Sequence, residues 1–135
     1  MNIKLGLKNL NMKVVRVGEA KSESQKIIGL INANPKAQKI IAAENWDVVF
    51  QFKLDEEPFY IQIQNGKLTL KNGTHSNPTL VITGSGASVA RASRGQGDFT
   101  HSISREEVEI KKGKVMELIR YGRAIATALK ETKSE

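Results

Sequence analysis

The chain has 135 residues, which suits a single domain with a buried core. Hydrophobic residues make up 39% of it and charged residues 26%, as in soluble globular proteins, and no apolar run approaches the roughly 18 residues of a membrane span. Cysteine is absent, which excludes disulfides, thiol catalysis and thiolate metal sites and suits the cytoplasm, where we expect the protein.

The net charge of +7 is unevenly placed, because residues 1–17 carry basic side chains and no acidic one. These basic residues are Lys4, Lys8, Lys13 and Arg16. The segment fits either a strand or an amphipathic helix, and it lacks the continuous apolar stretch of a secretion signal. We expect it to dock transiently on anionic membranes, with ordinary solubility charge as the alternative.

Two helices are expected to follow this extension. Ser22 or Ser24 can accept a hydrogen bond at the start of the first helix, as N-cap residues do. Asn34 followed by Pro35 is typical of an N-cap and a first helical residue, so the pair predicts the start of a second helix.

The centre of the chain alternates apolar and polar residues, which indicates strands with one dry and one wet face. Asn65-Gly66 tolerates the positive φ angles of a tight hairpin between the second and third strands. Since antiparallel sheets can leave one face wet, we expect a sheet of this kind with a cover on one side. The five predicted strands span residues 48–54, 59–64, 67–71, 79–83 and 108–111.

Further helices are expected after the fourth strand and at the end of the chain. Ser85 is expected to cap a helix that ends near Arg94, and Asp98 to cap a short turn carrying Phe99 and Ile103. The last helix, over about residues 114–130, has an apolar stripe at helical spacing. The stripe consists of Val115, Leu118, Ile119, Gly122, Ile125, Ala126 and Leu129.

This order of elements predicts an α+β fold, in which about five helices cover one face of a five-stranded, mainly antiparallel sheet. We assign residues 18–131 to this domain and residues 1–17 to a basic N-terminal extension. Residues 132–135 form a polar tail.

No motif indicates catalysis. The turn 84–86 follows a strand and opens a helix like a phosphate-binding loop, but the neighbouring strands do not form a parallel βαβ unit. His75 and His101 lack metal-ligand spacing, and the acidic turn 55–57 is expected to be solvated. Aromatic residues, at 5%, are too few for base stacking on the sheet. We therefore expect no metal, cofactor or nucleic acid, and an enzyme acting on a phosphate-bearing substrate is a minor alternative.

The order and spacing of several segments resemble the sterol carrier protein type 2 family of lipid-transfer domains. The resemblance covers about residues 27–129 and is carried by segments 49–53, 59–70, 78–84, 95–98 and 108–113. It implies a five-stranded sheet covered by helices and an apolar tunnel between the two layers. It further implies fatty acyl chains, phospholipids or sterols as ligands, and no catalytic residues.

Two departures from the family pattern bear on the site. Residues 87–93, after the fourth strand, are mostly alanine and serine, where the family often has bulky apolar residues. Arg105-Glu106 stands where a glycine commonly leads into the fifth strand. The small residues, together with Gly122, predict spare apolar volume under the helices, and a dry, closed core is the alternative.

We therefore predict a non-catalytic protein that binds and transfers an apolar lipid in a cavity between sheet and helices. A homodimeric interaction module with a closed core is the alternative. The predicted lipid-lining residues are Phe50, Phe52, Ile61, Leu80, Ile82, Val89, Phe99 and Ile103, closed by Val115, Leu118, Ile119, Ile125 and Leu129.

Overall fold

The structure, a computed structural model, describes residues 18–133. The basic extension with Lys4, Lys8, Lys13 and Arg16 lies outside these residues. In chain order, the elements are α1 (Glu19–Ala33), α2 (Pro35–Ala42), the 3-10 turn η1 (Ala43–Asn45), β1 (Val48–Leu54), β2 (Phe59–Gln64), β3 (Lys67–Asn72), β4 (Leu80–Gly84), α3 (Gly86–Ser93), α4 (Phe99–Ser104), β5 (Val108–Lys112) and α5 (Val115–Lys133).

The five strands form one sheet in the order β3-β2-β1-β4-β5. Every neighbouring pair is antiparallel except β1 and β4, which are parallel, so the predicted α+β fold with a mainly antiparallel sheet is confirmed. Asn65 and Gly66 form the β2–β3 hairpin with φ angles of 54° and 75°, the left-handed values that such a turn requires.

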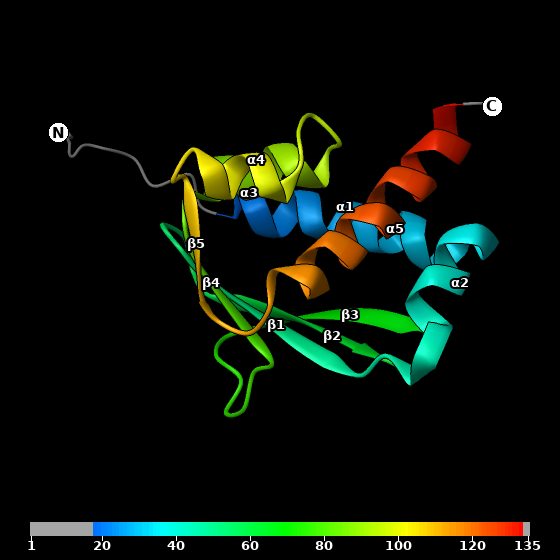
Figure 1. Cartoon of the computed structure of the whole chain (residues 1–135), viewed down its shortest axis with the longest axis horizontal. Coiled ribbons are helices and arrows are strands. Elements are labelled where there is room, and N and C mark those ends of the chain that lie inside the picture. The colour runs from blue at the N-terminus through cyan, green and yellow to red at the C-terminus, as the bar shows by residue number, and fades with distance from the viewer. Residues whose placement is uncertain (1–17, 134–135) are drawn as a thin grey trace, which may run out of the picture.

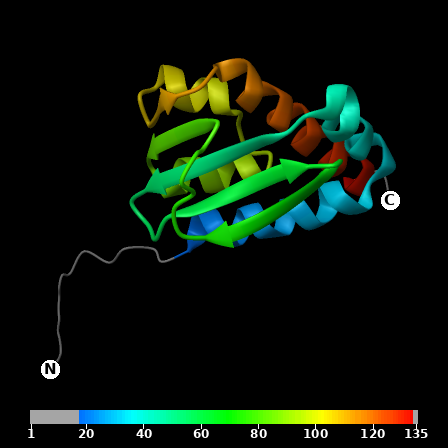
Figure 2. The same cartoon turned by 90° about the horizontal axis from the view of Figure 1, so that it is seen from below.

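The helices cover one face of this sheet, whereas the opposite face carries no helix of the described residues (Figures 1 and 2). Apolar side chains at every second strand position are buried beneath the helices, and between them Lys53, Thr69 and Glu109 are exposed. None of the helices within residues 18–133 is long and apolar enough to cross a membrane.

Gln51 is a buried polar residue on β1, and β2 together with the loop after β3 satisfies its hydrogen bonds. Its amide nitrogen donates to the carbonyls of Phe59 and Gly73, each at 3.1 Å, and its amide oxygen accepts from the His75 N–H at 2.7 Å. These bonds fix the loop that leads into β4, and they place His75 in a structural turn.

The start of α1 differs from the prediction. The helix begins at Glu19, so neither Ser22 nor Ser24 caps it. Instead, the Glu56 carboxylate, in the turn after β1, accepts hydrogen bonds from the Ala20 N–H at 3.1 and 3.0 Å. Burial raises the pKa of Glu56. The expectation that this acidic turn is only solvated is therefore wrong for Glu56.

The small residues of α3 allow close helix packing. α3 packs against α1, and both helices bury small side chains, which include Ala20 and Ser24 of α1 and Ala90 and Ser93 of α3. Small side chains let two helix backbones approach closely. Most small residues of α3 therefore mark close packing against α1, and only Ala92 among them borders the groove described below.

Polar contacts of Trp46, Glu117 and Arg120 fix the position of α5 over the sheet. The Trp46 indole N–H donates to the Glu117 carboxylate at 2.5 Å, and the Arg120 guanidinium lies 4.1 Å from the centre of the Trp46 ring. Arg120 also donates to the carbonyl of Ile40 at 2.9 Å. These contacts connect α5 to α2 and to the segment that precedes β1.

Glu106, in the Arg105-Glu106 pair before β5, adopts the backbone conformation that glycine favours. Its φ angle is 62°, and its N–H donates to the carbonyl of Ile103 at 2.9 Å. The Arg105-Glu106 pair therefore leads into β5 through a left-handed turn.

Candidate functional site

Two adjoining pockets lie between α5 and the segment that joins α3 to α4. Their volumes are about 380 and about 310 Å³, which places both at the lower end of the ~300–1,000 Å³ typical of small-molecule sites. Asp98, Phe99, Gly122 and Ala126 line both, so we treat them as one α4–α5 groove. The other lining residues are Ala92, Arg94, Gly95, Gly97, Thr100, Leu118, Ile119, Arg123, Ile125, Leu129 and Lys130.

Helix α5 presents two adjacent apolar strips. The inner strip is buried and consists of Leu118, Tyr121, Ile125 and Ala128, of which Leu118 and Ile125 also border the groove. The outer strip lines the groove, is at least partly exposed, and consists of Ile119, Gly122, Ala126 and Leu129. Both strips follow the helical spacing of three and four residues. The predicted apolar stripe thus combined members of two neighbouring strips, both of which reach the groove.

Gly122 keeps the groove open at the point where the two pockets meet. A Cβ atom placed on Gly122 would meet only Phe99 Cδ2, at 4.0 Å, beyond the helix's own backbone. Any larger side chain at this position would extend into the groove. The spare volume that Gly122 predicted is therefore present, although it lies beside α4 and not against the sheet.

The structure divides the predicted lining residues into three groups. Those that line the α4–α5 groove are Phe99, Leu118, Ile119, Ile125 and Leu129. Two others, Ile103 and Val115, line a separate pocket of about 780 Å³ beside β5. Those that lie in the closed core, at 0–1% exposure, are Phe50, Phe52, Ile61, Leu80, Ile82 and Val89. Which of these residues contact a lipid stays a prediction.

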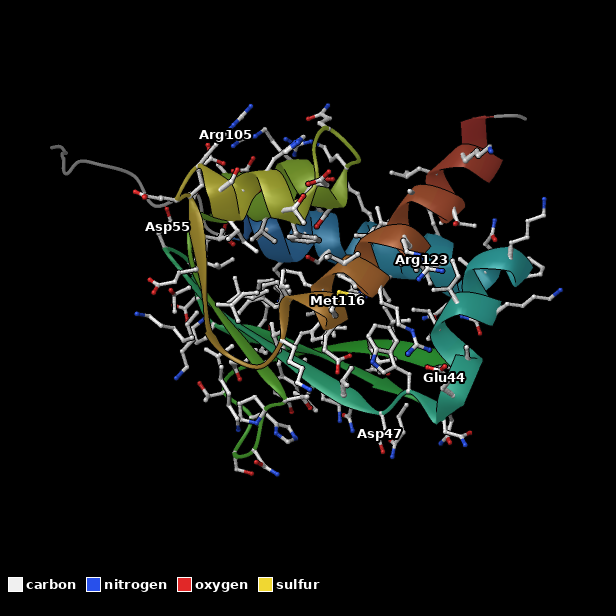
Figure 3. The ribbon with its side chains drawn as sticks, in the orientation of Figure 1. Glu44, Asp47, Asp55, Arg105, Met116 and Arg123 are labelled. Atoms are coloured by element: carbon white, nitrogen blue, oxygen red, sulfur yellow. The ribbon has the colours of Figure 1, made fainter. Side chains whose placement is uncertain are left out.

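Charged side chains surround the mouth of the groove. Arg94, Arg123 and Lys130 supply positive charge there, and Asp98 supplies negative charge. Arg94 is also paired with Glu23 of α1 at 3.5 Å. Arg123 lies on α5, well along the helix from Met116 in its first turn (Figure 3). An apolar groove with a largely basic rim can hold an apolar chain and leave a polar headgroup in water.

Asp98 caps α4 and takes no part in a catalytic triad. Hydrogen bonds from the Thr100 hydroxyl and the His101 N–H hold the pKa of Asp98 below its usual value. The Ser102 hydroxyl accepts from the Ser88 hydroxyl at 2.7 Å, and the His101 side chain is exposed. Ser102 and His101 are therefore not arranged for nucleophilic catalysis.

The helix start at residues 84–86 is occupied by the protein's own carboxylate. Ser85 caps α3, as predicted, by accepting from the Ser88 N–H at 3.1 Å. The Gly86 N–H donates to Asp55 at 2.7 Å, and Asp55 directly follows the end of β1 (Figure 3). Among residues 18–133, no group of three or more histidine, aspartate or glutamate side chains could hold a metal ion.

Tyr121 belongs to this region and was missed in the sequence. Its side chain is fully buried, with its ring centre 5.5 Å from that of Phe50 and 6.0 Å from that of Phe99. Its hydroxyl has no hydrogen-bond partner among the described residues. Burial raises the pKa of Tyr121, so the hydroxyl remains a neutral donor. Its spacing from Leu118 and Ile125 was the signal that could have placed it in the core.

No protein-family model matches the sequence, and no curated protein matches it. Among solved structures, it is similar to the sterol carrier protein domain 2 of Helicoverpa armigera, with 15% identity, a TM-score of 0.64, and coverage of 90% of this chain and 96% of that one. Sterol carrier protein 2 of Aedes aegypti in complex with palmitate shows 14% identity and a TM-score of 0.58, over 85% of this chain and 97% of that one. The UbiJ-SCP2 ubiquinone synthesis protein shows 10% identity and a TM-score of 0.62, over 81% of this chain and 94% of that one. The chain therefore has the fold of the sterol carrier protein 2 domains.

Proposed function

We propose that the protein binds an apolar lipid in the α4–α5 groove and transfers it without catalysing a reaction. The observation that carries this proposal is the outer strip of α5, where Ile119, Gly122 and Leu129 line an open groove. The fold adds support, because the Aedes aegypti protein of the same fold is described in complex with palmitate. We place this activity in the cytoplasm and assign no catalytic, metal-binding or cofactor-binding role to any residue.

The energetics of burial allow useful affinity. Each methylene removed from water contributes about 0.8 kcal/mol, so ten methylenes contribute about 8 kcal/mol before ordering costs. A micromolar Kd is therefore within reach. The acyl chain would lie along the outer strip, and the basic rim at Arg123 and Lys130 would face its headgroup. Core residues such as Phe50 would contact the guest only if the guest displaced the Phe99 side chain.

A fluorescent fatty acid is expected to bind the purified protein with a micromolar Kd and to be displaced by unlabelled lipids. Extraction of the purified protein with organic solvent, followed by mass spectrometry, would identify the natural guest. Size-exclusion chromatography with light scattering, on the same sample, addresses the alternative. A homodimer that neither binds the probe nor yields extractable lipid would contradict lipid binding and favour the interaction module.

The basic extension, residues 1–17, is assigned to delivery at anionic membranes. Its deletion is expected to weaken binding to phosphatidylserine vesicles at least about tenfold, because each basic residue near such a surface contributes about 1 kcal/mol. The affinity for a fluorescent fatty acid should stay unchanged, since the groove lies in residues 92–130. Vesicle co-sedimentation at low and high salt measures the effect. Vesicle binding equal to that of the full chain would remove this role.

A further inference from the structure

Tyr121 carries an unpaired hydroxyl in the interior of the protein. Its side chain has 0% exposure, and its hydroxyl oxygen has no hydrogen-bond partner among the described residues. A buried polar group without a partner costs about 1–3 kcal/mol, and natural proteins contain few such groups. A partner that is absent from the protein chain itself, such as a bound guest, would remove this cost.

The other buried hydroxyls without a partner in the described residues, Ser24 and Ser93, have a local explanation. Both lie inside helices, where a serine hydroxyl can rotate to bond the backbone carbonyl one turn earlier. The phenolic oxygen of a tyrosine stands a whole ring away from its own backbone and cannot make this bond. Tyr121 therefore needs a partner from outside its helix.

Phe99 contacts both Tyr121 and the α4–α5 groove. The Phe99 side chain lines both pockets, and its ring stacks on that of Tyr121 with centres 6.0 Å apart and an angle of 27°. Gly122, the next residue of α5, borders both pockets as well. A rotation of the Phe99 side chain away from Tyr121 would open the groove toward the tyrosine ring.

We propose that the Tyr121 hydroxyl anchors the inner end of the bound lipid by donating a hydrogen bond to a neutral oxygen. This rests on the proposed lipid binding in the α4–α5 groove. The rings that pack on Tyr121, Phe50 and Phe99, are apolar, so a carboxylate or phosphate placed among them would lose its hydration. Such a charged group would stay at the rim, beside Arg123 and Lys130. Tyr121 therefore selects a lipid with an ester, ketone or hydroxyl oxygen at its buried end.

Tyr121→Phe removes only the hydroxyl and tests this anchor. Wild type and variant are compared by displacement of a fluorescent fatty acid with dodecane, 1-dodecanol and methyl dodecanoate. The variant is expected to bind the alcohol and the ester about five- to tenfold more weakly, the worth of one hydrogen bond. Its affinity for dodecane should match that of the wild type, because the alkane accepts no hydrogen bond. For each guest, the affinity of the variant is compared with that of the wild type, so differences in solubility between guests cancel.

Thermal unfolding without lipid supplies a second readout. Tyr121→Phe is expected to raise the unfolding midpoint, because it removes an unpaired buried hydroxyl. A lower midpoint would show that the hydroxyl already has a partner in the protein, and an equal loss of affinity for all three guests would show a packing effect. Either result overturns the anchor and leaves lipid binding standing. Failure of every guest to displace the probe from the wild type would reject lipid binding itself.

Discussion

Gly122→Leu is expected to weaken the binding of a fluorescent fatty acid at least about tenfold while the protein stays folded. A side chain at Gly122 enters the space shared by the two pockets, where Phe99 Cδ2 is the nearest atom to a Cβ at 4.0 Å. A leucine there would displace at least two methylenes of a guest, and two methylenes are worth about 1.6 kcal/mol. Fluorescence titration measures the loss.

Two variants control for the change in helix stability. Gly122→Ala replaces the same helical glycine, is expected to stabilise the fold by up to about 1 kcal/mol, and leaves most of the groove open. Gly29→Leu adds a leucine to α1 at an exposed position where a Cβ meets nothing within 4 Å. Both should bind the probe within about threefold of wild type, since neither fills a pocket. Wild-type affinity in Gly122→Leu would show that the guest lies elsewhere.

The sheet was largely predictable because its sequence signals are local. Alternation of apolar and polar residues identified the strands, and Asn65-Gly66 identified the hairpin with its left-handed φ angles. The parallel pairing of β1 with β4 was not predictable in this way. Alternation records which face of a strand is dry, but not which strand lies beside it or in which direction.

The start of α1 likewise depends on a nonlocal contact that local sequence patterns do not reveal. Ser22 and Ser24 have the residue type of an N-cap, yet Glu56 binds the Ala20 N–H from a turn 36 residues away. A hydrogen bond of this range depends on the fold already being formed, so no local pattern indicates it.

The helix that carries the candidate site was predictable from the sequence, but the residues of that helix that line the groove were not. Helical spacing found the apolar residues of α5, but which of them face the sheet depends on the rotation of α5 about its axis. That rotation is fixed by nonlocal contacts, such as the Trp46–Glu117 hydrogen bond and the Arg120–Trp46 stacking. Tyr121 is hard to place from sequence, because a tyrosine on a helix can lie either in the core or at the surface. Small residues are ambiguous as well, since they marked close packing on α3 and open space at Gly122.

Phe50→Ala is expected to lower the free energy of unfolding by about 3–5 kcal/mol, the usual cost of deleting a buried aromatic ring. Phe50 has 0% exposure, and its ring lies edge-on to those of Trp46 and Tyr121, with centres 5.9 and 5.5 Å away. The deletion would leave a cavity between the sheet and α5. Urea denaturation of the lipid-free protein, followed by tryptophan fluorescence and circular dichroism, measures the change.

Ile119→Ala gives the matched comparison, because Ile119 is only half-buried and lines the groove. It is expected to cost about 1 kcal/mol of stability and to weaken probe binding about threefold to fivefold, since it removes apolar wall from the guest. Phe50→Leu, which keeps the core filled, should leave probe affinity unchanged. The opposite pattern, with little loss of stability in Phe50→Ala and altered probe binding in Phe50→Leu, would mean that the guest extends past Tyr121 to the sheet. Phe50 and its core neighbours would then line the site, and the α4–α5 groove would be its entrance.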